Sequence, residues 1–195
     1  MMRNNDITLL LASQSPRRRA LLKEIGFPVK IVQPPNVDEI FPIHLKRGEI
    51  PVYLSQLKAN AYLEPIPDNC ILVTADTIVW VNEEVIGKPL NREDAIAMLQ
   101  KLSGSKHQVY TGVCLKYKGI CHLFCDETNV YFRNLTEEEI IYYVDQYKPF
   151  DKAGAYGVQE WIGFIGVERI EGSYFNVMGL PTHLLYKEIL TLIKH

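Results

Sequence analysis

The 195-residue chain has no long hydrophobic run and no marked excess of charge of one sign. Its apolar run near the N-terminus, Ile7–Ala12, is far too short to cross a bilayer. Arg17, Arg18 and Arg19 follow that run and no cleavage-like stretch is present, unlike the pattern of a signal peptide. We therefore expect neither a membrane anchor nor an export signal.

Cysteine is scarce, and its spacing argues against the common cysteine frameworks. The four residues, Cys70, Cys114, Cys121 and Cys125, include no CxxC pair, and three of them lie in apolar, strand-like segments. This context suits small buried side chains in a reducing compartment better than disulfides or a zinc site. The expected location is the cytoplasm.

The charges nearly cancel, with 21 Lys and Arg against 23 Asp and Glu and a formal net charge of -2. Such a chain has no overall attraction to nucleic acid or to a membrane, so any phosphate binding has to come from a local cluster. The length suits one domain or two intimate lobes with a sizeable core. We expect a single domain over residues 1–195.

Strand-like and helix-like segments alternate in the first half of the chain. Apolar runs predict the strands, and cap residues such as Ser15 before Pro16 mark the helix starts. The dipeptide at 118–119 predicts a hairpin turn between two long strands. The expected strands cover residues 7–12, 29–32, 71–73, 109–117, 120–132, 161–170 and 172–177. The expected helices begin at or near Pro16, Pro51, Asn91, Thr136 and Pro181.

The segment Asp151–Gln159, DKAGAYGVQ, combines an acid, a base, glycines and an amide within a short stretch. Gly154 and Gly157 permit a positive φ or a close backbone approach, so the segment suits neither a regular helix nor a strand. Around them Lys152 and Gln159 can supply charge and hydrogen bonds. A tight structural turn is the alternative interpretation.

A second cluster, Ser13–Arg19, joins the end of the first strand to the start of the first helix. The first turn of a helix offers free N–H groups and the positive end of a dipole, which together bind anions. Arg17 and Arg18 can add bidentate phosphate contacts there. A solvated basic helix start is the alternative, although cations at this end of a helix are unfavourable without an anion. The cluster favours phosphate binding.

Asp76 is expected at the tip of the strand ILVTAD. In open α/β sheets, ligands collect at the carboxyl ends of the strands. An acid there, between Thr74 and Thr77, can bind a divalent metal or take a proton from water. A local turn between the aspartate and a threonine is the alternative.

Single polar residues add weaker signals. Lys58 lies on a predicted helix and Lys88 in the rigid sequence GKP, but most lysines are only solvated. Glu39 can be a solvated loop residue or a metal ligand. His107 is expected to be a structural, hydrogen-bonding residue rather than a catalyst.

Together these residues resemble the Maf family of nucleoside triphosphate pyrophosphatases, once labelled septum-formation inhibitors. The matching motifs run in the family's order from Leu11 to Leu180 and include LASQSPRR, VDE, ADTIV, GKP, LSGSKHQVYTGV, DKAGAYGVQ and GSYFNVMGLP. The resemblance implies an α/β fold with a long twisted mixed β-sheet flanked by helices, two lobes around a central cleft (ITPase-like), and a homodimer. It also implies hydrolysis of nucleoside triphosphates to the monophosphate and pyrophosphate with Mg2+ or Mn2+.

The late motif is similar to that of the subgroup acting on dTTP and UTP, with modified pyrimidine nucleotides as further candidates. The resemblance makes Asp76 the general base and assigns Asp76 and Glu39 to the metal. It assigns substrate binding or specificity to Ser13, Arg17, Arg18, Lys58, Thr77, Lys88 and Gln159. The chain departs from the family at Glu160, where glycine is usual, and a side chain at this point can reshape the base pocket.

Two other functions stay open. A regulatory protein that inhibits cell division through a protein partner would not need Asp76. A phosphatase that releases phosphate stepwise would yield no pyrophosphate. The nucleotide interpretation further requires that the arginine-led helix start lie close to Asp76.

Overall fold

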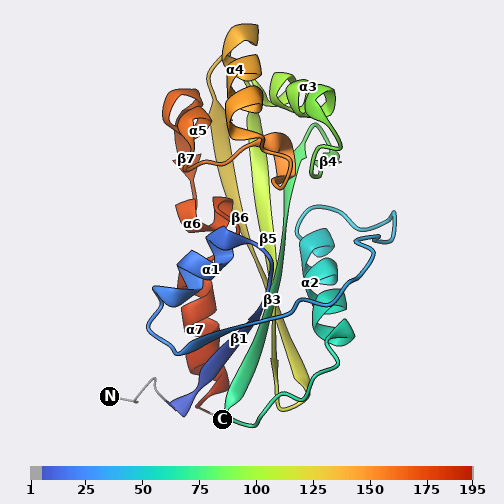
Figure 1. Cartoon of the computed structure of the whole chain (residues 1–195), viewed down its shortest axis with the longest axis vertical. Coiled ribbons are helices and arrows are strands. Elements are labelled where there is room, and N and C mark those ends of the chain that lie inside the picture. Colours follow the sequence, from blue (N-terminus) through green and yellow to red (C-terminus); the bar gives the residue numbers. More distant parts are fainter. Residues whose placement is uncertain (1–5, 195) are drawn as a thin grey trace. The chain divides into compact units, whose positions relative to one another are not determined.

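The computed structural model describes residues 6–194, and its architecture is a seven-stranded mixed β-sheet flanked by helices (Figure 1). The strands are β1 (Thr8–Ala12), β2 (Val29–Val32), β3 (Cys70–Val81), β4 (Glu84–Ile86), β5 (Lys106–Tyr117), β6 (Ile120–Phe132) and β7 (Val167–Glu171). Their order is β2-β1-β3-β5-β6-β7, with β4 paired to β3. This architecture confirms the expected α/β fold with a mixed sheet.

The helices follow the strands along the chain. They are α1 (Pro16–Lys23), α2 (Glu49–Ala61), α3 (Arg92–Leu102), α4 (Glu137–Tyr147), α5 (Trp161–Gly166), α6 (Tyr174–Val177) and α7 (Thr182–Leu192). A short 3-10 turn covers Ala153–Ala155. Within residues 6–194, every helix is too short or too polar to span a membrane.

The chain divides into two compact units. Unit 1 contains the described residues of Met1–Asp76, Thr111–Asp126 and Gly179–His195, and unit 2 contains Thr77–Tyr110 and Glu127–Met178. The residue ranges of β3, β5 and β6 each extend over both units.

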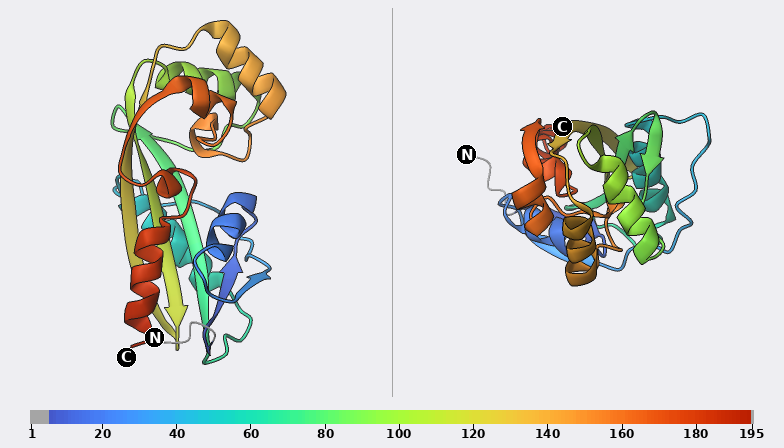
Figure 2. Two further views of the ribbon diagram at one scale, coloured as in Figure 1. Left: turned by 90° about the vertical axis from the view of Figure 1, so that its left-hand side faces the viewer. Right: turned by 90° about the horizontal axis from the view of Figure 1, so that it is seen from above.

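Unit 1 is built around β1, which pairs in parallel with β2 on one side and β3 on the other. Four of the five residues of β1 are buried, as expected for a continuous apolar strand. Helices α2 and α7 lie against opposite faces of this part of the sheet (Figure 2). A hydrophobic cluster lies between the sheet and α2; its buried members are Leu10, Ala12, Ala59, Cys70, Leu72 and Cys114. None of the four cysteines, all within the described residues, forms a disulfide, and Cys70 and Cys114 are buried.

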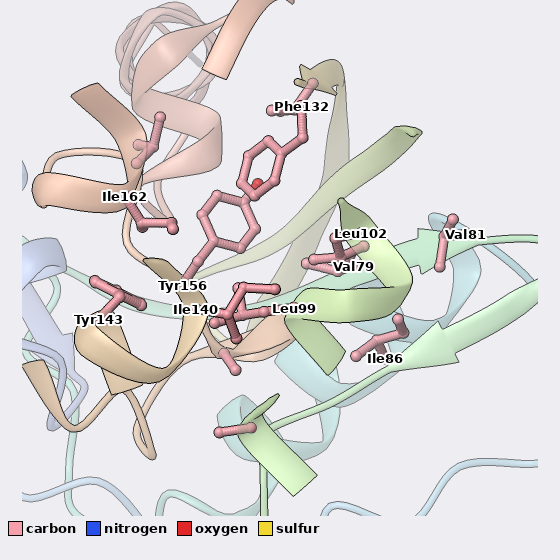
Figure 3. Close-up of a cluster of buried hydrophobic side chains, with 14 of the residues drawn as sticks. Val79, Val81, Ile86, Leu99, Leu102, Phe132, Ile140, Tyr143, Tyr156 and Ile162 are labelled. Carbon is pink, nitrogen blue, oxygen red and sulfur yellow. The ribbon is translucent and has the colours of Figure 1, made fainter. Parts of the chain in front are cut away.

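Unit 2 has its own hydrophobic core between strands and helices α3, α4 and α5 (Figure 3). Tyr156 and Phe132 meet edge to face there, with 5.0 Å between their ring centroids. His107 is fully buried beside both rings, and its Nε2 lies 2.8 Å from the Tyr156 hydroxyl. His107 therefore has the structural, hydrogen-bonded environment that its position suggested.

Most expected elements are present, with small shifts at their ends. The cap residues act as expected: Ser15 caps α1, Asn91 caps α3, and Thr136 forms a complete capping box at α4. The hairpin turn at 118–119 is also confirmed, because both of its residues have positive φ.

Of the two strands predicted late in the chain, 161–170 is confirmed only at residues 167–170, which lie in β7, and 172–177 is wrong. Residues 161–166 form α5, because Ile162 and Gly166 are buried one helical turn apart while Phe164 between them is 78% exposed. In a strand these three residues would share one face. Residues 174–177 form α6, whose N-cap Ser173 accepts a hydrogen bond from the Asn176 N–H.

Candidate active site

The start of α1 is shaped by hydroxyl groups in the preceding turn. The Ser15 side chain accepts a hydrogen bond from the Arg18 N–H at 3.4 Å. The Ser13 hydroxyl in turn accepts from the Ser15 N–H at 3.2 Å, and Ser13 is buried. The Arg19 guanidinium donates to the Ser13 carbonyl at 3.1 and 3.2 Å. The turn therefore has a defined conformation, and half-buried Arg17 occupies the second helical position.

Arg18 ties this helix start to two distant segments of unit 1. Its Nε donates to the Gly179 carbonyl at 2.7 Å, and its Nη1 donates to the Ala75 carbonyl at 2.8 Å. Burial lowers the pKa of Arg18, while the nearby charges of Asp76 and Glu39 oppose that shift. The predicted proximity of the arginine-led helix start and Asp76 is confirmed.

Asp76 lies within a long strand, not at a strand tip. Strand β3 continues from Asp76 through the buried run to Val81, so the predicted strand end is wrong. The register pairs Leu11 with Val73, and β1 ends one residue later at Ala12. Asp76 therefore lies on the part of β3 that extends beyond the carboxyl end of β1. Ligands of open α/β sheets collect near the carboxyl ends of strands, and the strand that ends close to Asp76 is β1, not β3.

Helix α2 brings Lys58 to Asp76. The Thr74 hydroxyl donates to the Ser55 carbonyl at 2.7 Å, which joins β3 to α2. Thr74 and Asp76 share one face of the strand, and Ser55 and Lys58 share one face of the helix. The hydrogen bond between Thr74 and Ser55 therefore places Lys58 opposite Asp76. Lys58 Nζ lies 2.5 Å from Asp76 Oδ1.

Lys58 also binds the second predicted acid. Its Nζ lies 2.7 Å from a carboxylate oxygen of Glu39, so one ammonium joins the loop, α2 and β3. The side chains of Asp76 and Lys58 are 10% and 14% exposed, whereas that of Glu39 is 42% exposed. Two carboxylates and two cations, counting Arg18, thus meet in unit 1, and Glu39 leaves one side of the group open to solvent.

This group has the composition of a site for an anionic ligand and a cation. No set of three or more His, Cys, Asp or Glu side chains in residues 6–194 is arranged to hold a metal ion. Asp76 and Glu39 are nevertheless two oxygen donors that converge on one cationic atom. Carboxylate oxygens of this kind are the ligands that hard divalent cations prefer in proteins.

Three predicted site residues, Thr77, Lys88 and Gln159, belong to unit 2. Gln159 follows a loop in which Gly154 has a φ of 69° and Gly157 lies close against the Glu160 side chain, so each glycine has one of the two predicted properties. The Oε1 atom of Gln159 is buried and has no hydrogen-bond partner within the described residues. A buried acceptor of this kind costs free energy unless a ligand or water satisfies it.

The contacts that hold this loop were not predicted from the sequence. Tyr143 on α4 and Glu160 at the start of α5 are hydrogen-bonded to each other, and Glu160 also forms an ion pair with Lys152. Lys152 and Glu160 were each singled out in the sequence, and as a base and an acid near the two ends of one glycine-containing segment they could have been predicted to pair. Tyr143 gave no signal, because its helical position reads as ordinary core.

The chain matches the family model described as "Maf-like protein" over residues 8–192. A dTTP/UTP pyrophosphatase of Bacteroides fragilis is 52% identical over 181 residues, covering 93% of this chain and 94% of that protein. A dTTP/UTP pyrophosphatase of Christiangramia forsetii is 49% identical over 189 residues, covering 97% and 95%. The corresponding protein of Porphyromonas gingivalis is 46% identical over 183 residues, covering 93% and 92%.

A solved structure supports the fold independently. The HAM1 protein from Coxiella burnetii superposes with a TM-score of 0.52 at 12% identity, covering 95% of this chain and 99% of that one. At this identity the likeness concerns the fold alone. Because the family model spans nearly the whole chain and the relatives match it over almost their full length, the chain belongs to the Maf-like protein family.

Proposed function

We propose that this chain hydrolyses dTTP and UTP to the nucleoside monophosphate and pyrophosphate. Its relatives named dTTP/UTP pyrophosphatase match it over more than nine-tenths of its length. The observation that carries the proposal is that Lys58 joins Asp76 and Glu39, with Arg18 at the neighbouring Ala75 carbonyl. A chain with a formal net charge of -2 can hold a triphosphate only through such a local concentration of cations.

A divalent cation suits the proposed reaction, and the residues present fit one. Mg2+ is usually held by one or two carboxylates, with waters and substrate phosphates completing its oxygen shell. Asp76 and Glu39 have this chemistry, since their carboxylates gather on one ammonium. When bound, the cation would neutralise phosphate charge and make a bound water more acidic.

The chain's own residues have distinct roles in the proposed reaction. Asp76 orients a water for in-line attack on the α phosphorus and accepts its proton at a carboxylate oxygen. Lys58 fixes that carboxylate. Arg18 contributes charge toward the departing pyrophosphate, although its Nε and Nη1 are bound to backbone carbonyls. We assign Ser13, Arg17, Thr77 and Lys88 to substrate binding on the resemblance of their motifs.

Gln159 is the residue we propose for reading the base. Its buried Oε1 lacks a partner within the described residues, and its amide group supplies two donors. An amide can therefore accept from the N3–H of thymine or uracil and donate to O4. This pairing supports a pyrimidine preference and provides a partner for an otherwise unsatisfied acceptor.

The decisive experiment incubates the purified chain with each nucleoside triphosphate and either Mg2+ or Mn2+, and assays monophosphate and pyrophosphate together. We expect dTTP and UTP to be preferred, with one pyrophosphate released per monophosphate. Release of inorganic phosphate would support stepwise phosphatase activity and contradict attack at the α phosphorus.

The substitution Asp76→Asn tests the proposed base. It keeps the side-chain shape but removes the proton acceptor, so kcat should fall by about 10²- to 10⁴-fold while KM changes little. Asp68→Asn, at an exposed position of unit 1, is the matched control and should keep wild-type turnover. Full turnover in Asp76→Asn would remove Asp76 from the mechanism.

The homodimer, the lack of affinity for nucleic acid and membranes, and the cytoplasmic location remain predictions of the sequence. Size-exclusion chromatography with light scattering tests the first of these directly. A monomer at micromolar concentration would contradict the predicted homodimer and leave the proposed chemistry intact.

A further inference from the structure

Glu160 stands where the resemblance predicts glycine, and its side chain turns back into the preceding loop. It is the N-cap residue of α5, yet its carboxylate makes no capping hydrogen bond to that helix. An N-cap side chain normally satisfies free N–H groups of the first turn. The carboxylate of Glu160 is therefore directed to other partners.

The first partner is Tyr143 on α4. The Tyr143 hydroxyl donates to Glu160 Oε2 and accepts the Gly157 N–H at 3.0 Å. Tyr143 is completely buried, so it cannot touch a ligand. Burial and the Glu160 charge both raise the pKa of Tyr143, so its hydroxyl stays a neutral donor.

The second partner is Lys152 near the beginning of the loop. Its side chain is only 9% exposed, and its Nζ lies 3.1 Å from Glu160 Oε1 and 2.7 Å from Asp151 Oδ1. A buried ammonium needs nearby negative charge to offset the lost hydration. Glu160 thus joins both ends of the segment 151–160 to each other.

Steric contact adds to these polar contacts. A Cβ placed on Gly157 would lie 2.7 Å from the Glu160 carboxylate carbon, closer than packed atoms approach. The Glu160 carboxylate therefore packs directly against the Gly157 backbone. Gln159 lies between Gly157 and Glu160, so both of its flanks are held.

We infer that Glu160 is a positioning residue that sets the specificity of the base-reading loop, acting through Tyr143 and Lys152. This inference rests on the proposed function, in which Gln159 reads the pyrimidine. Glu160 fixes the backbone on both sides of Gln159 and so holds its amide in the orientation that matches O4 and N3–H. The side chain at this position thereby supports pyrimidine selectivity instead of entering the base pocket.

The test compares Glu160→Gln and Tyr143→Phe with the wild type on dTTP, UTP, ATP and GTP. Each variant loses one charge or one hydroxyl at nearly constant shape. We expect kcat/KM for dTTP and UTP to fall about tenfold, mainly through KM, because one buried charged hydrogen bond is lost. Activity on the purine nucleotides should change little, so the pyrimidine-to-purine ratio should fall with kcat nearly constant.

A double variant that combines substitutions at Gln159 and Tyr143 distinguishes the positioning role from a general loss of stability. Gln159→Glu should itself reduce the pyrimidine-to-purine ratio. Adding Tyr143→Phe to it should reduce the ratio no further, because Tyr143 acts only through the orientation of Gln159. Asp145→Asn is the matched control: it removes an exposed ion pair with Arg92 from the same helix and should leave selectivity unchanged.

Amide hydrogen exchange supplies a readout independent of catalysis. Exchange in segment 151–160 should become faster in Glu160→Gln and Tyr143→Phe but not in Asp145→Asn. Unchanged exchange in both variants would overturn the positioning role. Faster exchange with unchanged selectivity would overturn the link to base recognition. Failure of the wild type to hydrolyse any nucleotide would reject the proposed function alone, because exchange still decides whether Glu160 holds the loop.

Discussion

Two buried ionisable side chains of unit 2 are accommodated in opposite ways. The Lys152 ammonium is paired with the carboxylates of Asp151 and Glu160, which lie within 3.1 Å of it. His107 is fully buried between aromatic rings, and burial lowers its pKa from 6.5 to about 3. It is therefore neutral at physiological pH, with the Tyr156 hydroxyl as its hydrogen-bond partner. The environment of His107 predicts a response to pH.

His107 should make the fold sensitive to mild acid. Between pH 6.5 and about 3 the unfolded chain binds a proton at this residue and the native chain does not, so stability falls as the pH falls. The slope from one such group is at most about 1.4 kcal/mol per pH unit. Urea denaturation at pH 7, 6 and 5 should show a smaller decline for His107→Gln than for the wild type.

The matched control for this prediction is His44→Gln, because His44 is exposed. That variant should keep the wild-type dependence of unfolding free energy on pH. If His107→Gln also keeps it, then His107 does not carry the effect.

At the scale of elements, the position of α2 decides where Lys58 lies. The helix meets β3 through the hydrogen bond from Thr74 to Ser55. It meets β5 at Gly112, where an added Cβ would lie 2.3 Å from backbone atoms of Pro51 and Val52. Such an approach is possible only for glycine. The first turn of α2 can thus approach β5 closely because Gly112 has no side chain.

Gly112→Ala should displace α2 from the sheet. The new methyl group meets rigid backbone, so we expect a loss of about 1–3 kcal/mol in unfolding free energy. Turnover should also fall, because Lys58 lies on the displaced helix. Gly87→Ala is the stability control, since its Cβ would meet no atom within 4 Å. Equal stability of both variants in urea denaturation would show that α2 adjusts freely.

At the scale of the whole molecule, three long strands connect the two units through the chain itself. The residue ranges of β3, β5 and β6 each include residues of both units. Loss of strand order in one unit should therefore propagate along the same strands. The single domain expected from the sequence remains a prediction.

The single-domain prediction can be tested with the natural probes of the chain. Both tryptophans, Trp80 and Trp161, belong to unit 2, whereas circular dichroism reports helices of both units. We expect the two signals to change together in urea. Gly112→Ala, a change in unit 1, should lower the midpoint of the tryptophan transition as well. Separate midpoints, or an unmoved tryptophan transition in that variant, would indicate independent units.

Local chemistry made much of the fold predictable. Helix starts at Ser15, Asn91 and Thr136 follow from side chains that cap the backbone N–H groups of their own first turns. The helix at 161–166 was mistaken for a strand, because a short apolar run does not reveal its period until burial is known. The long continuation of β3 was missed for a related reason: polar Thr74, Asp76 and Thr77 resemble a strand end.

The sequence by itself determined the family, the residue types of the candidate site and the glycine-dependent loop, because these depend on motifs and on backbone freedom within a few residues. Only the tertiary structure decided that Lys58 bridges Asp76 and Glu39, and that Glu160 holds its loop through Tyr143. The physical reason is that an ion pair or a buried hydrogen bond requires atoms within about 3 Å of each other. The number of residues between two positions in the sequence does not reveal such proximity, because strand register and helix packing determine which side chains meet.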